Sequence, residues 1–160
     1  MADALDLAFE IATRPNFDCL HDPNPRTALI EPYHDPVGYP TQGYGRLLSR
    51  VEWEDLSKYP AITVEQAKAD LVVDLKTAQR GTHRLIKADL QPHQWAALYD
   101  FTFNAGAGNL QISAFRAQIN RGELADVPQQ LLRWVYANHV KWPGLVRRRA
   151  AEGRMWTEGR

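Results

Sequence analysis

The segment PYHDPVGYPTQGYGR, residues 32–46, limits the fold of this chain more than any other stretch of it. Its prolines lack the backbone donors that a helix needs and its glycines favour tight turns, so this segment cannot be helical. Strand-like pairs alternate with glycine turns across residues 29–45, which predicts a small antiparallel hairpin or a three-stranded sheet. One acid, Asp35, lies within it. That carboxylate either caps the turn or works with a second carboxylate elsewhere in the chain.

Helical periodicity accounts for most of the remaining chain. Thr63 and Gln66 form a capping-box pattern, and apolar residues follow at helical spacing to about residue 80. Gly81 then interrupts them, although Leu85 and Ile86 could continue the same face. The stretch 91–106 is apolar on a broad face, which predicts a central buried helix. The expected helices cover residues 3–13, 63–80, 91–106, 111–121, 124–137 and 144–156, with a further short helix within residues 47–57.

These elements predict a single domain over residues 1–160, of the α+β class and mostly α. We expect a small β-containing lobe at about residues 15–60. A larger helical lobe would comprise about residues 61–160 together with the N-terminal helix. The long helix after Thr63 would join the two lobes, and a cleft between them would suit a polymeric ligand.

Composition argues against several function classes. The formal net charge is zero at pH 7, so no global attraction to nucleic acid or to an anionic membrane is built in. The sequence has one cysteine, Cys19, and its five histidines show no HxxxH spacing, which argues against a disulfide or a zinc site. It contains no GxxxxGK or GxSxG motif. We therefore expect no metal, no cofactor, no nucleic-acid partner, no membrane insertion and a monomeric protein.

Four segments, in order, resemble the phage-type lysozymes, the muramidases of glycoside hydrolase family 24. PYHDPVGYPTQGYGRLLS is similar to the family pattern aYxDpxGxxTIGYGHxL, and ITVEQAKADLVVDL is similar to iTxxeAexlLxxDl. LQPHQWAALYDFTFNAGAGNL resembles LtxxQxdALvsFxFNxGxG, and RWVYANHVKWPGLVRRRAAE resembles RWvxaxgxxxxGLxxRRxxE. The resemblance covers about residues 28–156 and implies a lysozyme-like two-lobe fold around a substrate cleft.

The resemblance also implies an activity, the hydrolysis of the β-1,4 bond between N-acetylmuramic acid and N-acetylglucosamine in bacterial peptidoglycan. The family uses a Glu at the end of the first helix as general acid, an Asp nine residues later, and a Thr six residues after that Asp. Asp35 and Thr41 match the Asp and the Thr and would position or activate the water. Asn104 would bind a sugar N-acetyl group, although it fits a helix C-terminal cap equally well. The expected substrate contacts are Gly45, Leu47, Phe103 and Asn104.

The family Glu is absent from its usual place, because Arg26 stands nine residues before Asp35. Arginine keeps its proton near neutral pH and cannot act as the general acid. Glu10 is the favoured replacement, since it follows a Phe near the end of the first helix, as in the family. Asp18 is the runner-up, because a shorter carboxyl group with a lower ordinary pKa needs more desolvation to stay protonated. Glu31 is a third candidate, and loss of the acid is the remaining alternative.

Other departures and signals concern the surface. Arg46 replaces the family His and predicts an ion pair with Asp74 on the long helix. The arginine-rich end of the chain either faces an anionic polymer or forms a solvated helix face. Trp95 and Trp134 fit the core, whereas three tryptophans could be partly exposed and stack on sugars: Trp53, Trp142 and Trp156.

Two functions remain open. As a phage or prophage endolysin, the chain would cleave peptidoglycan glycan strands with Glu10, Asp35 and Thr41 during host lysis. The N-terminus has no basic signal-peptide region, so the protein would accumulate in the host cytoplasm until a holin-like pore or a virion delivers it to the periplasm and cell wall. Alternatively, it is a catalytically impaired lysozyme-fold protein that binds peptidoglycan or a protein partner.

Overall fold

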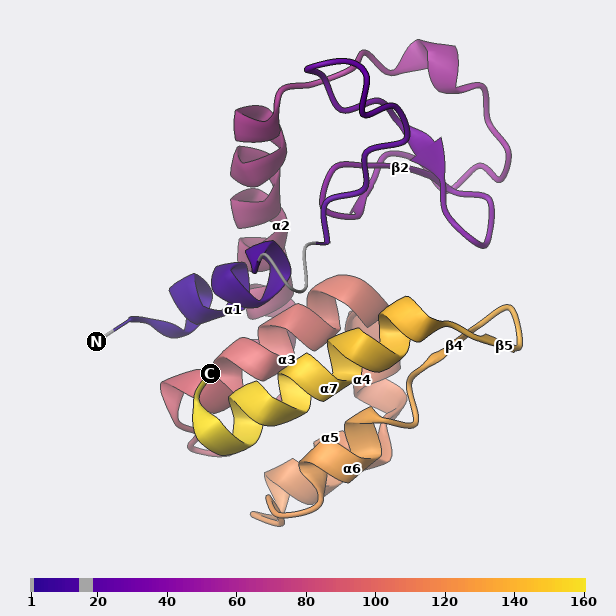
Figure 1. Cartoon of the computed structure of the whole chain (residues 1–160). Coiled ribbons are helices and arrows are strands. Elements are labelled where there is room, and N and C mark those ends of the chain that lie inside the picture. The colour runs from indigo at the N-terminus through magenta and orange to yellow at the C-terminus, as the bar shows by residue number, and fades with distance from the viewer. Residues whose placement is uncertain (1, 15–18) are drawn as a thin grey trace.

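The computed structural model describes residues 2–14 and 19–160 and has two lobes, with the helix α2 running from one to the other (Figure 1). Among the described residues, no helix is long and apolar enough to cross a membrane. The helices are α1 (Ala4–Thr13), η2 (Leu56–Lys58, a 3-10 turn), α2 (Val64–Leu85), α3 (Pro92–Ala105), α4 (Ala107–Ile112), α5 (Ala114–Asn120), α6 (Val127–Leu131) and α7 (Pro143–Glu158). The strands are β1 (Tyr33–His34), β2 (Pro40–Gln42), β3 (Arg46–Leu47), β4 (Tyr136–Ala137) and β5 (Val140–Lys141).

The smaller lobe is built on an antiparallel sheet in the order β1-β2-β3, which confirms the predicted three-stranded sheet. Thr41, at the centre of β2, pairs with Tyr33 on one side and Leu47 on the other. Such short strands form few backbone hydrogen bonds with one another, and a buried side chain supplies further hydrogen bonds. The amide of Gln42 donates to the carbonyl oxygens of Ile30 at 2.9 Å and Pro60 at 3.0 Å. Gln42 thus links the sheet to the two segments, at Ile30 and Pro60, through which the chain enters and leaves this lobe.

The larger lobe is organised around α3, which packs against α1, α2 and α7 (Figure 1). Residues 96–102 are buried without interruption, so the helix is covered on all sides, as its apolar sequence predicted. Pro92 occupies the first turn, where a missing N–H costs nothing. Gly106 ends the helix at a φ of 91°, a conformation that favours glycine.

The helix α2 begins as predicted, with the Thr63 hydroxyl accepting from the N–H of Gln66 at 3.0 Å. It continues to Leu85, past the glycine at which the sequence suggested an interruption. A Cβ added at Gly81 would lie 3.3 Å from the Cβ of Ala107 on α4. Gly81 therefore lets two helices approach closely and does not end α2.

The expected helix over residues 124–137 is wrong in its second half. Only α6, Val127–Leu131, is α-helical there, and the chain then enters the two-stranded β4–β5 hairpin. Asn138 and His139 both have positive φ, 51° and 62°, as a type I′ hairpin turn requires. Without the Asn-Gly pair typical of that turn, the sequence carried little signal for it.

Three smaller expectations also differ. Residues 47–57 contain no α-helix and end in the 3-10 turn η2. The helix expected at 111–121 is two helices, α4 and α5, separated at Ser113, whose hydroxyl accepts from the N–H of Arg116 and caps the second. Trp156 is only 4% exposed and belongs to the core, where its indole N–H donates to the Leu124 carbonyl at 3.2 Å.

Candidate active site

The carboxylate of Asp35 is held by the backbone of its own turn. Its Oδ1 accepts three N–H groups, from Val37, Gly38 and Tyr39, each at 2.9 Å. The chain can close so tightly because Gly38 adopts a φ of 100°. These three bonds fix the orientation of the carboxylate and leave Oδ2 outside them.

Thr41 is tied to the same turn through one carbonyl group. The Tyr39 carbonyl oxygen accepts the Thr41 hydroxyl at 2.9 Å and also the N–H of Asp35 at 3.0 Å. Thr41 is 5% exposed, so its rotamer is confined by packing. The structure therefore brings together the two residues that the family spacing predicted.

Tyr33 and His21 lie beside this pair. Tyr33 is the cross-strand partner of Thr41, and the rings of His21 and Tyr33 lie 4.2 Å apart. Burial, with smaller contributions from the nearby Asp35 and Cys19, raises the pKa of Tyr33 to about 12, against the lowering effect of Arg148. Its phenol is thus a neutral group near pH 7.

An open pocket of about 290 Å³ lies where β3 meets α2 and the α3–α4 junction. Three of the four predicted substrate residues line it: Gly45, Leu47 and Phe103. Gly45 has a φ of 94°, and a Cβ added there would lie 4.0 Å from Cζ of Phe103. The two lobes thus meet at this point through a glycine and an aromatic ring.

The fourth predicted residue, Asn104, does not line this pocket. Its Oδ1 accepts from Nη2 of Arg149 at 2.7 Å. Because that bond fixes which way the amide faces, its NH₂ group is directed away from Arg149. The side chain therefore has a defined orientation, which a helix cap alone would not require.

The predicted ion pair between Arg46 and Asp74 is replaced by a neighbouring one. Arg46 Nη1 lies 2.8 Å from Oδ1 of Asp70, one helical turn earlier on α2. Asp74 also lines the pocket, and its Oδ2 is buried with no hydrogen-bond partner in the described part of the chain. Burial raises the pKa of Asp74, with Arg46 opposing the rise and Asp70 adding to it.

Two of the C-terminal arginines are buried, so neither interpretation of the basic tail applies to them. Arg148 is 6% exposed and Arg149 is 1% exposed. Arg148 donates to both oxygens of Asp100, at 2.7 and 2.9 Å, and Arg149 donates to Glu152 at 2.7 Å. This Asp100–Arg148–Arg149–Glu152 cluster, called the buried ionic cluster below, was not predicted. The RRxxE spacing was its only sequence signal.

The two carboxyl groups of the buried ionic cluster differ in pKa. Burial favours a higher pKa at Asp100, but the charge and hydrogen bonds of Arg148 hold it below its ordinary value. Burial raises the pKa of Glu152 well above its ordinary value, against the lowering effect of Arg149. A raised carboxyl pKa is typical of a general acid. Glu152 is 0% exposed, however, so no substrate reaches it, and its role is structural.

The candidate general acids lie in different places. Glu10 is exposed on α1, which continues three residues beyond it to Thr13. Glu31 accepts from the amide of Asn24 at 3.2 Å, and Arg26 is exposed in a loop. Asp18 lies outside the described residues.

Arg26 lies in a loop between two pairings of the chain. The chain leaves α1 and soon pairs with the sheet, since the His21 N–H donates to the Gly43 carbonyl at 3.1 Å. It then makes an excursion and returns at Ile30, which pairs with Ile62. Residues 22–29 thus form a loop between the helix and β1. A count of nine residues back from Asp35 ends in this loop and not on α1.

Known proteins share both the sequence and the fold of this chain. The SAR-endolysin of Bacteriophage PS119 is 37% identical over 122 residues, covering 76% of this chain and 70% of the relative. The SAR-endolysin of Enterobacteria phage PA-2 is 36% identical over 121 residues, with shares of 76% and 70%. The solved endolysin from Escherichia coli O157:H7 phage FAHEc1 has a TM-score of 0.72 and 25% identity, covering 98% of this chain and 92% of that chain. The sequence model described as Phage lysozyme matches residues 28–152, and the chain therefore belongs to the phage lysozyme family, with its lysozyme-like α+β fold.

Proposed function

We propose that this protein is a muramidase that hydrolyses the β-1,4 bond between N-acetylmuramic acid and N-acetylglucosamine in peptidoglycan. Family membership supports the reaction class. The observation that carries the proposal is the shared Tyr39 carbonyl, which accepts from the Asp35 N–H at 3.0 Å and from the Thr41 hydroxyl at 2.9 Å. A carboxylate and a hydroxyl fixed to one rigid turn can orient a water molecule without further ordering.

The hydrogen bonds assign each atom a task. Because the Thr41 proton is engaged by Tyr39, its Oγ1 offers lone pairs and accepts one hydrogen of the water. Because three N–H groups occupy Oδ1 of Asp35, Oδ2 is the oxygen that takes the other hydrogen as the water attacks. The pocket lined by Gly45, Leu47 and Phe103 would hold a sugar ring next to this water.

Glu10 is our proposed general acid, which protonates the leaving oxygen. It lies on α1, the helix that carries the acid in the family, and it is exposed and thus open to a polymer. The end of α1 is anchored near the sheet, since the Cys19 N–H donates to the Ala12 carbonyl at 3.1 Å and His21 pairs with Gly43. The loop 22–29 would absorb the additional residues between Glu10 and Asp35.

The test combines lysis with product chemistry. Wild type, Asp35→Asn and Glu10→Gln are added to outer-membrane-permeabilised Gram-negative cells, and turbidity is followed. We expect lysis by wild type and at least a ~100-fold loss of rate in both variants, as for removal of an acid or a base. Mass spectrometry of digested sacculi should find N-acetylmuramic acid at the new reducing ends. New ends carrying N-acetylglucosamine would contradict the assigned bond.

Matched controls come from acids that resemble the catalytic ones. Asp55 caps a turn of the same lobe through the Ser57 N–H at 3.0 Å, and Asp6 is exposed on α1. Asp55→Asn and Asp6→Asn should lyse cells like wild type. Full lysis by Glu10→Gln would remove Glu10 from the mechanism and direct attention to Asp18.

The second candidate function is binding without hydrolysis. Arg26, exposed in the loop 22–29 at the family position of the acid, is the observation in its favour. Retention on sacculi in a pull-down without any lysis by wild type would support it. Because several relatives are named endolysins, we propose in either case that the protein reaches the cell wall of a phage-infected host.

A further inference from the structure

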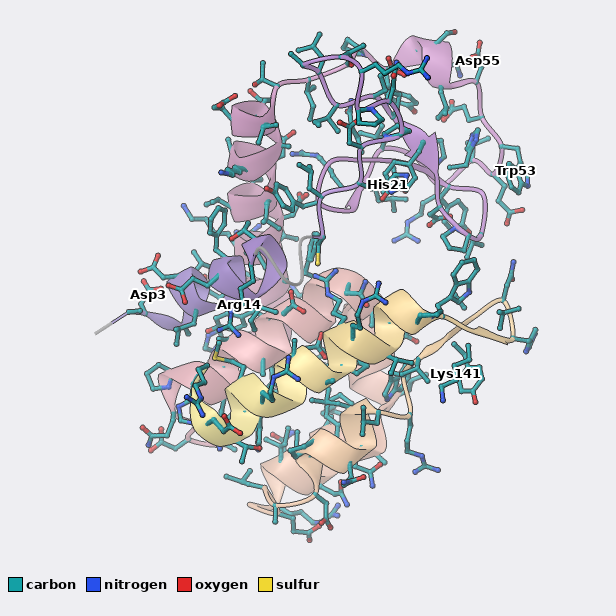
Figure 2. The ribbon with its side chains drawn as sticks, viewed as in Figure 1. Asp3, Arg14, His21, Trp53, Asp55 and Lys141 are labelled. Carbon is teal, nitrogen blue, oxygen red and sulfur yellow. The ribbon has the colours of Figure 1, made fainter. Side chains whose placement is uncertain are left out.

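Trp53 is an exposed aromatic side chain held in an unusual backbone conformation. It is 66% exposed, and its φ is 58°, in the left-handed region that bulky residues rarely adopt. Figure 2 shows it at the outer edge of the smaller lobe, on the loop between β3 and η2. A strained backbone that presents a large apolar ring to solvent offers no gain in stability by itself, and such strain persists where function uses it.

The indole ring is fixed against the turn that holds Asp35. The backbone N–H of Trp53 donates to the Gly38 carbonyl at 2.8 Å. A Cβ added at Gly38 would lie 2.7 Å from Cε2 and 2.9 Å from Nε1 of the indole. One face of the ring thus lies directly on the glycine backbone, where no other residue would fit.

The loop that carries Trp53 is braced on its other side. The His34 ring lies 5.2 Å from the indole, and its Nε2 makes a 2.9 Å hydrogen bond with the Glu54 carbonyl. The Glu54 carboxylate accepts from Lys58 at 2.6 Å and from the Tyr59 hydroxyl at 2.9 Å. The ring is therefore preorganised, so a ligand that covers it loses little side-chain entropy on binding.

The platform is continuous with the candidate active site. Gly38, which supports the indole, donates its N–H to Oδ1 of Asp35 at 2.9 Å. A single residue thus separates the ring of Trp53 from the carboxylate that we propose as the base. A glycan strand that is bound at Asp35 and extends along this turn would reach the ring.

We propose that Trp53 is a stacking platform for a sugar ring of the peptidoglycan strand, beyond the sugar held in the pocket of Gly45 and Phe103. One face of a pyranose consists of C–H groups, which match the flat apolar face of an indole. The assignment rests on the proposed function, because it takes the same glycan as the ligand. The platform raises affinity for long strands and takes no part in bond cleavage.

The test measures binding separately from cleavage. In an Asp35→Asn background, which leaves sacculi intact, Trp53→Phe and Trp53→Leu are compared for retention on purified Gram-negative sacculi. Phenylalanine keeps an aromatic face, whereas leucine covers Gly38 without one. We expect leucine to weaken binding by about two- to tenfold and phenylalanine by less, in line with the strength of aromatic stacking. Val51→Ala, at a neighbouring exposed apolar residue, should bind like the parent.

A second measurement locates the contact. On addition of chitohexaose, the indole N–H signal that Trp53→Phe removes from the NMR spectrum should shift. Thermal unfolding of each variant reports any loss of packing on Gly38.

Each outcome decides the proposal. Equal binding by Trp53→Leu and the parent, or equal loss in the leucine and phenylalanine variants, would overturn the platform while leaving the muramidase proposal intact. Failure of the parent itself to bind sacculi, with no lysis by wild type, would overturn both.

Discussion

Asp35 and Asp100 are both carboxylates held by several donors, but the donors come from opposite sources. Asp35 is bound by three backbone N–H groups within four residues of it, on a turn at the surface of the smaller lobe. Asp100 is bound by Nε and Nη2 of one guanidinium, that of Arg148, which lies on a helix and is 48 residues away in the sequence. The donors of Asp35 belong to its own turn, and Asp35 is partly exposed. The donor of Asp100 is distant in sequence, and Asp100 is 0% exposed.

The difference separates the carboxylate that we propose to be catalytic from a structural one. At Asp35 the three N–H groups of the turn all bind one oxygen, so the other can react while the turn keeps its shape. At Asp100 both oxygens are taken by one partner, which satisfies a buried charge and leaves nothing for a substrate. A perturbed pKa does not make this distinction, because Glu152 in the same buried ionic cluster has the raised pKa of a general acid and no access to solvent.

The largest expected effect is the loss of the distant donor. Arg148→Met should lower the free energy of unfolding by about 3–5 kcal/mol, because it leaves Asp100 charged and buried without its partner. Urea denaturation at pH 7 measures the change. Arg147→Met, at the exposed neighbour, is the matched control and should stay within about 0.5 kcal/mol of wild type.

A double variant tests whether the loss at Arg148 is an unpaired charge or a packing defect. Asp100→Asn combined with Arg148→Met should recover part of the stability, since position 100 then holds no unpaired buried charge. A double variant as unstable as Arg148→Met alone would show that shape, and not charge, dominates at this position.

The second effect concerns the local site. Asp35→Ala removes the acceptor of three N–H groups and should cost about 1–2 kcal/mol, comparable to the loss of a helix cap. Asp35→Asn keeps an oxygen acceptor and should cost less, yet both variants should abolish lysis. Equal stability of Asp35→Ala and wild type in urea would show that the backbone closes this turn without the side chain.

The pH dependence of stability probes Glu152. Its folded pKa lies well above the ordinary value of 4.5, so the folded protein binds this proton more tightly than the unfolded chain does. Stability from this group is complete below about pH 4.5 and is lost as pH rises through the folded pKa. Glu152→Gln mimics the neutral, protonated form. Its free energy of unfolding should therefore rise relative to that of wild type between pH 5 and pH 8. A constant difference in unfolding free energy across that range would contradict the raised pKa.

The same contrast explains what the sequence could predict. The turn around Asp35, its partner Thr41 and the start of α2 depend on residues a few positions apart, and each was predicted. The partners of Arg148 and Arg149 depend on how α7 lies against α3, which no local pattern encodes, so these arginines were assigned to the surface. The β4–β5 turn was missed for another reason. Asn138 and His139 adopt a positive φ that their sequence pattern does not predict.

The position of the general acid shows the limit of spacing as evidence. Counting from Asp35 reached Arg26, because the count assumes that the chain runs directly from α1 to β1. The pairing of His21 with Gly43 and of Ile30 with Ile62 reveals a loop in between. Spacing thus predicted Asp35 and Thr41, which the structure places on one turn, whereas across the loop 22–29 it points to no acid, and Glu10 remains a prediction.

The smallest expected effect concerns the pair between the two lobes. Asp70→Asn removes the 2.8 Å contact with Arg46 and should cost only about 0.2–1 kcal/mol, because Arg46 is 36% exposed and salt screens the pair. Arg46 and Asp74 line the same pocket, so a turn of the Arg46 side chain toward Asp74 would reduce the loss further. For Asp74→Asn, the free energy of unfolding should instead increase relative to that of wild type as pH rises. Burial raises the pKa of Asp74, so the charged form of this carboxyl group disfavours folding. If Asp74→Asn costs more than Asp70→Asn in urea at pH 7, then Arg46 prefers in solution the partner that the family spacing first indicated.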